Sequence, residues 1–154
     1  MLDTDANIYN RTMAALILGN FADRDSAWFA LMDAQRDPIG PASSTASQVL
    51  SMLVKSSARP VDWRPAVQQL RYIIDGTNLF AFNETLDVLT ATRIDRALAP
   101  ALLANGGSVL RAKLRSGDVV SKRSVAAFLS HVSGLPATSD AATFERWMDG
   151  LGKI

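Results

Sequence analysis

Seven cationic residues in the second half of the chain have the clearest potential for chemistry. They are Arg93, Arg96, Arg111, Lys113, Arg115, Lys122 and Arg123. Long cationic side chains that converge on one track bind phosphate groups, and arginine adds forked donors that match phosphate oxygens. Arg93 and Arg96 are three apart, so on a helix they would share a face. The set predicts a binding site for the RNA backbone; the alternative is an ordinary solvated helix face.

Signatures of an enzyme are missing from the sequence. It contains no GxxxxGKS or GxxxxGKT, no GxGxxG, no GxSxG and no HExxH pattern. It has no cysteine and a single histidine, His131, which lies beside apolar residues and is expected to be structural. Asp23 and Asp25 would point away from each other on a helix, which is typical of N-terminal caps. We therefore expect no catalytic residue, no metal and no cofactor.

Charge is distributed unevenly, although the formal net charge of the 154 residues is only +1. Residues 1–92 hold seven Lys and Arg against ten Asp and Glu, and residues 93–154 hold nine against five. A polyanion could meet the basic half, or the acidic half of one copy could meet the basic half of another. Because these surfaces are unlike, we predict head-to-tail self-association rather than a closed two-fold dimer.

The spacing of apolar residues predicts a mostly helical, all-α protein that forms one domain over residues 1–154. Capping residues and proline or glycine stops divide the pattern into segments. Helices are expected at residues 5–20, 25–36, 45–56, 83–99, 108–115, 121–132 and 140–151. The larger apolar residues of the first segment fall largely on one face: Ile8, Met13, Leu16 and Ile17.

Two stretches raise specific expectations about loops. Asp37–Ser43 holds two prolines and a glycine and predicts a turn-rich loop, with Ser44 or Thr45 capping the helix that follows. Trp63 lies between two prolines, so we expect it in an irregular segment, where it could contact another subunit.

The stretch around residues 71–82 fits two structures. Asp75-Gly76 between apolar runs is a hairpin signal, which favours a small two-stranded ribbon. Pro65 is a good first residue of a helix, so the preceding AVQQLRYII segment could be helical instead. We expect a short helix from Pro65, with a possible β-ribbon near residues 71–82.

Membrane and export segments are not visible. The longest apolar runs, such as residues 13–18, are far shorter than the roughly 20 residues that a membrane span needs. The acidic N-terminus, with Asp3 and Asp5, lacks the basic start of a signal peptide. Hydrophobic residues make up 48% and charged residues 20%, as in ordinary globular proteins. We expect a cytoplasmic protein without a membrane partner.

The order of these segments resembles the coat proteins of rod-shaped plant RNA viruses, of the tobamovirus and hordeivirus type. The segments that carry the resemblance are AWFALMDA (27–34), PASSTASQVLSMLVKS (41–56), ARPVDWRPAV (58–67), FNETLDVLTATRIDR (82–96) and TFERWMDGL (143–151). The family's usual RFP after the second helix is replaced by Trp63-Arg64-Pro65. The similarity spans nearly the whole chain.

This resemblance implies an antiparallel bundle of about four main helices with a small ribbon distal to the RNA. It implies subunits that stack in a helical array around single-stranded RNA, in a virion or the host cytoplasm. Arg93 and Arg96 would correspond to the arginines after the third long helix that approach RNA phosphates. The glycines at 106, 107 and 117 interrupt the helix that should carry the other cations.

The rival interpretation is a helical adaptor or regulatory protein that binds a protein partner or DNA. SKRSVAAFLSHVSG through TFERWM could form a helix-turn-helix pair, with a linker that is long for that motif. A non-catalytic RNA-coating subunit and an adaptor are therefore the two functions that the sequence favours, with an enzyme of unrecognised residues as a minor third.

Overall fold

The computed structural model describes residues 7–37, 40–76, 81–105 and 107–151. Within these ranges every element is helical, which confirms the all-α prediction. The α-helices are α1 (Ile8–Leu18), α2 (Asp25–Ala34), α3 (Gly40–Ser57), α4 (Val67–Ile74), α5 (Phe82–Ala91), α6 (Ala99–Leu102), α7 (Ser108–Arg115), α8 (Val119–Ser133) and α9 (Ala141–Leu151). Short 3-10 helices are η1 (Gly19–Phe21), η2 (Arg64–Ala66) and η3 (Arg96–Leu98).

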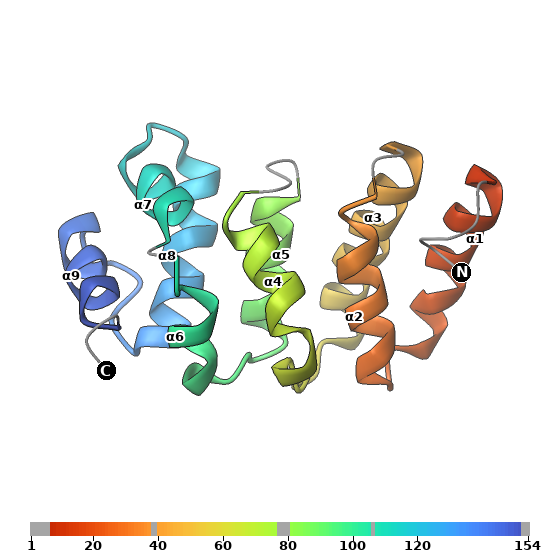
Figure 1. Ribbon diagram of the computed structural model, residues 1–154, viewed down its shortest axis with the longest axis horizontal. Helices are drawn as coiled ribbons and strands as arrows, with labels where there is room; N and C mark the ends of the chain where they lie inside the picture. The colour runs from red at the N-terminus through yellow and green to blue at the C-terminus, as the bar shows by residue number, and fades with distance from the viewer. Residues whose placement is uncertain (1–6, 38–39, 77–80, 106, 152–154) are drawn as a thin grey trace.

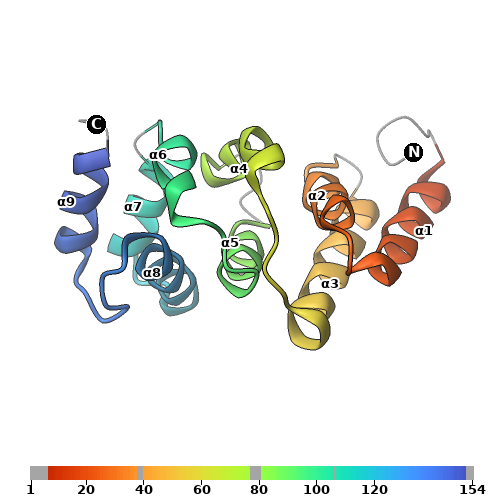
Figure 2. The ribbon, with the colours of Figure 1, turned by 90° about the horizontal axis from the view of Figure 1, so that it is seen from below.

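The helices form an elongated stack two layers deep. One layer holds α2, α4 and α6, the other holds α3, α5 and α8, and α1 and α9 lie at opposite ends (Figures 1 and 2). Contacts run along the layers from α3 to α5 and from α5 to α8, and across them from α2 to α3. Stacked helices of this kind bury a continuous core between neighbours and expose long outer surfaces.

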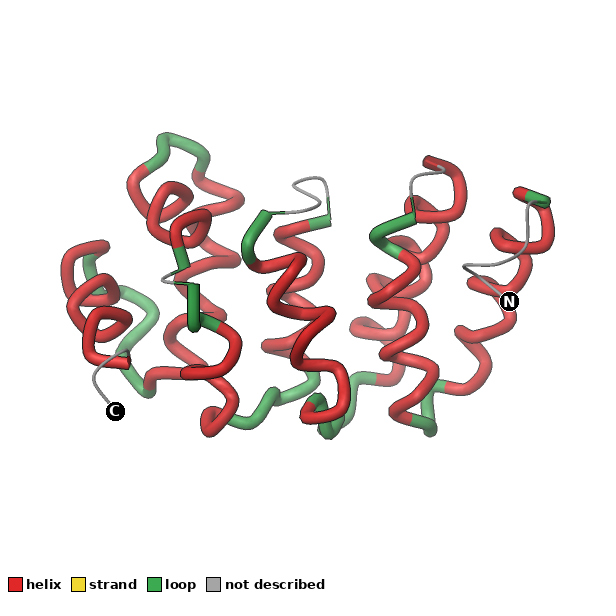
Figure 3. The backbone as a smooth tube through the Cα atoms, in the orientation of Figure 1, coloured by secondary structure: helices red, strands yellow, loops and turns green. Residues whose placement is uncertain are grey.

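The described residues form more helices than the expected four main ones, because short breaks divide the predicted segments. Residues 83–99, predicted as one helix, are divided where α5 ends at Ala91 and Asp95 caps η3. Gly107, with a left-handed φ of 61°, starts α7. From α1 to α5 consecutive helices run in alternate directions, whereas α6 is followed by α7 without a reversal at an edge of the stack (Figure 3).

One cluster of buried side chains extends through the stack from Ala15 in α1 to Met148 in α9. Its largest fully buried members are Trp28, Trp63, Phe82, Phe128 and Phe144. A buried polar link joins three helices: Gln35, which follows α2, donates to the Ser47 hydroxyl in α3 at 3.1 Å and accepts from the Thr85 hydroxyl in α5 at 2.9 Å. Each polar group of this link therefore has a partner, as burial requires.

The expectation that Trp63 contacts another subunit is wrong. Its side chain is 1% exposed, its Nε1 donates to the Thr92 hydroxyl at 2.8 Å, and its ring lies 5.4 Å from that of Phe29. The loop is drawn inward because the Val61 amide also donates to the Thr92 carbonyl oxygen. Trp63 is therefore a core residue that ties two loops together.

No strand forms in the described part of residues 71–82, so the ribbon prediction is wrong there. Arg71–Ile74 completes α4, and Phe82 begins α5; residues 77–80 lie outside the described ranges. Helical spacing buries Leu70, Ile73 and Ile74, and Gly76 follows in the left-handed conformation with φ of 95°. Asp75-Gly76 therefore ends a helix, as glycine commonly does, and makes no hairpin turn.

Helix α3 begins earlier than predicted. Gly40–Ser43, expected as loop, is its first turn, while residues 38–39 lie outside the described ranges. Thr45 does not cap the helix, since its hydroxyl donates to the Pro41 carbonyl oxygen within it at 2.8 Å. Proline is tolerated in a first turn because the amide it lacks would have no helical partner there.

Candidate nucleic-acid interface

Arg93 and Arg96 do not share a helix face, contrary to the prediction. Arg93 follows the end of α5 in a turn, in the left-handed conformation with φ of 53°, and Arg96 is the first residue of η3. The turn is fixed from both sides: the Thr92 hydroxyl donates to the Val88 carbonyl oxygen at 2.7 Å, and the Asp95 carboxylate accepts from the Ala97 amide at 2.9 Å. Both arginines are exposed.

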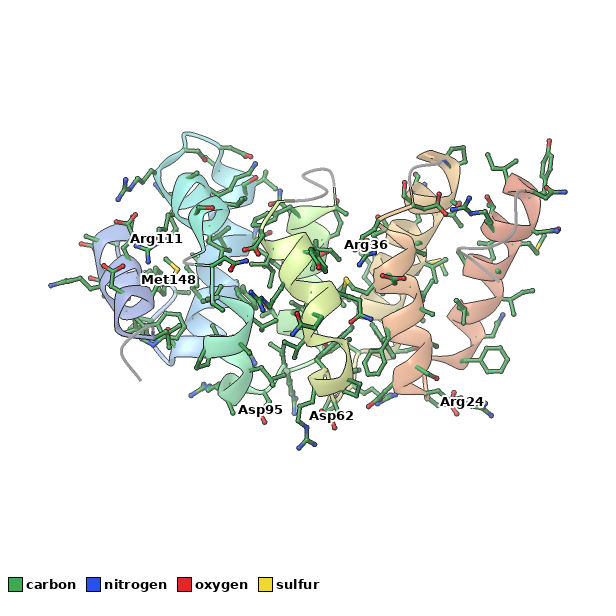
Figure 4. All side chains as sticks on the ribbon, in the orientation of Figure 1. Arg24, Arg36, Asp62, Asp95, Arg111 and Met148 are labelled. Atoms are coloured by element: carbon green, nitrogen blue, oxygen red, sulfur yellow. The ribbon has the colours of Figure 1, made fainter. Side chains whose placement is uncertain are left out.

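The loop that carries these arginines lies against the C-terminal end of α8. His131 Nε2 is 2.8 Å from the Ile94 carbonyl oxygen, which fits the structural role expected for this histidine. A Cβ placed on Gly134, the residue after α8, would lie 3.3 Å from an Arg96 guanidinium nitrogen. Arg96 therefore lies beside the end of α8 where carbonyl dipoles favour a cation. Asp95, in the same loop, lies at the lower edge of the stack (Figure 4).

Arg111 and Arg115, four apart on α7, form ion pairs with α9. Arg111 donates to Asp149 at 2.8 Å, and Arg115 makes a two-pronged contact with Glu145 at 2.7 and 2.6 Å. The hydrogen bond from Arg115 lowers the pKa of Glu145 below its ordinary value. These two arginines hold α9 to α7, and Figure 4 shows Arg111 between the two helices.

Lys113 belongs to a polar cluster at the start of α8. Its Nζ donates to the Ser121 hydroxyl at 3.3 Å, and the Asn83 side-chain amide donates to the same oxygen at 3.0 Å. Ser121 donates in turn to Asp118, the N-cap of α8, and this hydrogen bond lowers the pKa of Asp118. The Ser121 hydroxyl of α8 is therefore shared between Lys113 of α7 and Asn83 of α5.

Lys122 and Arg123 are exposed in the first turns of α8. Neither forms an ion pair with a carboxylate in the described part of the chain, and the same holds for Arg93 and Arg96. Because α8 has 15 residues, these two pairs of cations lie near opposite ends of a helix about 22 Å long. The seven predicted residues are thus not one track: three are occupied by contacts within the chain, and the other four lie in or beside α8.

Other kinds of site find no support in the described ranges. There, no three His, Asp or Glu side chains gather where they could hold a metal ion. Among the same residues, no helix combines the length and apolar character needed to cross a membrane.

Comparisons with known proteins assign nothing further: no family of known proteins, no curated protein and no solved structure matches this chain. Its function has to be argued from the geometry of its own residues.

Proposed function

We propose that this chain is a non-catalytic structural protein that binds the sugar–phosphate backbone of single-stranded RNA along α8. The observation that carries the proposal is the division among the cations. Arg111 and Arg115 are neutralised by carboxylates of α9, whereas four exposed cations around α8 have no described carboxylate partner. These four are Arg93, Arg96, Lys122 and Arg123.

The surface between the two pairs suits a polyanion. The part of α8 that follows Arg123 contains no acidic residue, and its half-exposed side chains include Ala126, Ala127 and Ser130. Small side chains let a phosphate backbone approach closely, and no carboxylate on this part of α8 repels it. Of the rings on α8, Phe128 is fully buried and the half-buried His131 imidazole is hydrogen-bonded to the Ile94 carbonyl oxygen, so the helix offers no Phe, Tyr or Trp ring for bases to stack on. Binding should therefore be electrostatic and independent of RNA sequence.

The sequence resemblance gives this proposal its more specific form, a coat subunit that packages RNA in a helical array as part of a virion. In that form, copies of the chain lie side by side and each covers a short length of RNA. Support for this form comes from the segments quoted above together with the four exposed cations that have no described carboxylate partner. RNA binding can be tested without it.

The test is a titration of labelled homopolymeric single-stranded RNA at several salt concentrations, comparing wild type with two double variants. For both Arg93→Ala/Arg96→Ala and Lys122→Ala/Arg123→Ala, the slope of log affinity against log salt should flatten by roughly 0.7 per lost phosphate contact. Lys55→Ala is the matched control, an exposed cation in the last turn of α3. If both double variants keep the wild-type slope, the four cations do not contact RNA phosphates and the proposal is wrong.

A second candidate, a helical adaptor that binds a protein, is favoured by one separate observation. The outer face of α1 exposes large apolar side chains, including Met13 at 56% and Ile17 at 51%. Exposed apolar faces of this kind mark protein contacts. A wild-type chain that binds neither single-stranded RNA nor duplex DNA at low salt would favour the adaptor over any nucleic-acid function.

A further inference from the structure

The outer face of α1 is lined mainly by large apolar side chains. Its exposed apolar side chains are Tyr9 at 80%, Met13 at 56%, Leu16 at 49% and Ile17 at 51%, with Phe21 of η1 at 40%. Successive residues of a helix are 100° apart, so the four on α1 fall within about one third of its circumference. The opposite side buries only Arg11 and Ala15. Four of the larger apolar residues of α1 therefore point away from the core, while Leu18 packs against it.

This face is held firmly in place. Gly19, which follows α1, approaches α3 so closely that a Cβ there would lie 2.9 Å from a Val49 methyl carbon. Arg11 forms a buried ion pair with Asp37, which follows α2. Figure 1 shows α1 at the end of the stack with no described helix on its outer side. These contacts set the orientation of α1, and Figure 4 shows side chains of α1 projecting away from the rest of the stack.

From these observations we infer that a second copy of this chain packs on the α1 face in a two-fold, antiparallel helix contact. A two-fold axis pairs each residue of the face with another residue of the same face, and a residue on the axis with its own equivalent, so a face that carries charge of one sign repels itself. The α1 sequence, IYNRTMAALIL, has one charged residue, Arg11, and that residue is buried. Self-contact therefore buries the apolar side chains of α1 without like-charge repulsion among them, while the Arg24 guanidinium, 5.5 Å from the centre of the Phe21 ring, borders the Phe21 end of the face.

The opposite end of the stack explains why the α1 face should meet α1 of the second copy and not its α9. Helix α9 exposes Arg146 and Asp149, together with the small residues Ala142 and Gly150. A head-to-tail stack would place these two charges on the apolar face of α1 and strip them of water at a cost. This geometry therefore favours a closed pair over the head-to-tail association expected from charge alone.

The size of the face sets the strength of the contact. If each of the five side chains loses on the order of 100 Å² of solvent-accessible surface on association, the two copies together bury roughly 1,000 Å². This area is near the lower limit for specific protein interfaces. The dimer should therefore form reversibly and depend on concentration. It involves none of the cations around α8, so it goes beyond the proposed RNA binding and can be measured in the absence of RNA.

The first experiment is sedimentation velocity of the purified chain over a range of concentrations. The wild-type mass should rise from one chain toward two, and Met13→Glu/Ile17→Glu should weaken dimerisation by at least about tenfold. Val119→Glu is the matched control, because Val119 is 76% exposed at the start of α8. Circular dichroism checks that each variant folds, as expected for exposed positions.

The second experiment separates a two-fold contact from a head-to-tail one. The chain has no cysteine, so single cysteine variants report one contact each. Met13 is the middle residue of α1, where a two-fold axis would pass, and oxidised Met13→Cys should form a disulfide-linked dimer. Val119→Cys should form no disulfide-linked dimer, although it still associates through α1.

Three outcomes would overturn the inference. A wild-type chain that is monomeric at every concentration would leave the α1 face to a different protein. A dimer that Met13→Glu/Ile17→Glu does not weaken would place the contact elsewhere. Crosslinking of Met13→Cys/Arg146→Cys, without any crosslinking of Met13→Cys alone, would show a head-to-tail array.

Discussion

The two ends of the helix stack use apolar and charged side chains in opposite ways. Helix α9 turns Phe144 and Met148 inward and forms its ion pairs at the surface, where Arg115 is 68% exposed. Helix α1 turns Met13 and Ile17 outward and buries its ion pair, with Arg11 and Asp37 side chains 11% and 1% exposed. The α9 end thus resembles the polar cap that stacked helices need for solubility, and the α1 end lacks one.

This difference shows that amphipathicity alone does not tell which face of a helix meets the core. In α1 the helical period is present and the apolar face is well defined, yet the stack packs against the side that carries Ala15. Its neighbours α2 and α3 decide the orientation, through contacts that hold the helix close at Gly19. An end helix with an outward apolar face is therefore a surface to test for partners.

The largest expected effect comes from breaking the ion pair at the α1 end. Asp37→Ala leaves the Arg11 cation buried without its carboxylate, and we expect a loss of about 3–5 kcal/mol of unfolding free energy. Urea denaturation followed by circular dichroism measures it. The double variant Arg11→Met/Asp37→Leu is the control, because replacing both partners with apolar residues should recover most of the stability. A double variant as unstable as the single one would mean that shape, not charge, matters there.

A smaller effect is expected near the α9 end, at the glycine beside Arg96. Gly134 has φ of 79°, and a Cβ there would lie 3.3 Å from the Arg96 guanidinium. Gly134→Ala should cost about 1–2 kcal/mol, since an L-residue is strained in this conformation. Gly150→Ala is the control, because a Cβ at that position meets nothing within 4 Å. Equal unfolding midpoints for the two variants in urea would contradict the strain at Gly134.

The sequence predicted the elements whose signals are local. The fully buried residues of α8, such as Val125, Phe128 and Leu129, follow the spacing expected for a helix over 121–132. The break at Arg93 was missed because neither glycine nor proline marks it. Its left-handed turn follows Thr92, whose hydroxyl accepts a hydrogen bond from Trp63, 29 residues away. A contact between distant segments cannot be deduced from the spacing around it.

In the candidate site, too, some features have a local signal in the sequence and others depend on contacts between distant segments. The exposure of Arg123 follows from its place opposite the apolar face of α8, so sequence reasoning could find it. Lys122 lies seven residues before the buried Leu129, on the apolar side of the helix, and is exposed because the first turn of α8 lies beyond the core. The loss of Arg111 and Arg115 to α9 depends on tertiary packing. Even so, both helices carry the matching signal: Glu145 and Asp149 are four apart, as are the two arginines they bind. Complementary spacing in two helices predicts such pairs only once their contact is known.

The smallest expected effect concerns the exposed pair between α7 and α9. Arg115 lowers the pKa of Glu145 in the folded chain, so folding is favoured by this pair when the glutamate is ionised. That contribution is present at neutral pH, above the unfolded pKa, and is lost as the pH falls through the lowered value. Because the pair is exposed to solvent, salt should weaken it as well.

Arg115→Gln tests this pair by removing the charge while keeping a long polar side chain. At neutral pH and low salt the variant should have a slightly smaller unfolding free energy than wild type, and the difference should shrink as the solution becomes acidic enough to protonate Glu145 in both proteins. Lys55→Gln is the control, an exposed cation in the last turn of α3 that forms no ion pair with a described carboxylate. Urea titrations at neutral and acidic pH measure both differences. If the loss of unfolding free energy in Arg115→Gln were the same at every pH, the guanidinium would stabilise α9 by packing and not by its charge. The exposed ion pairs at the α9 end would then make no electrostatic contribution to stability, in contrast to the buried pair at the α1 end.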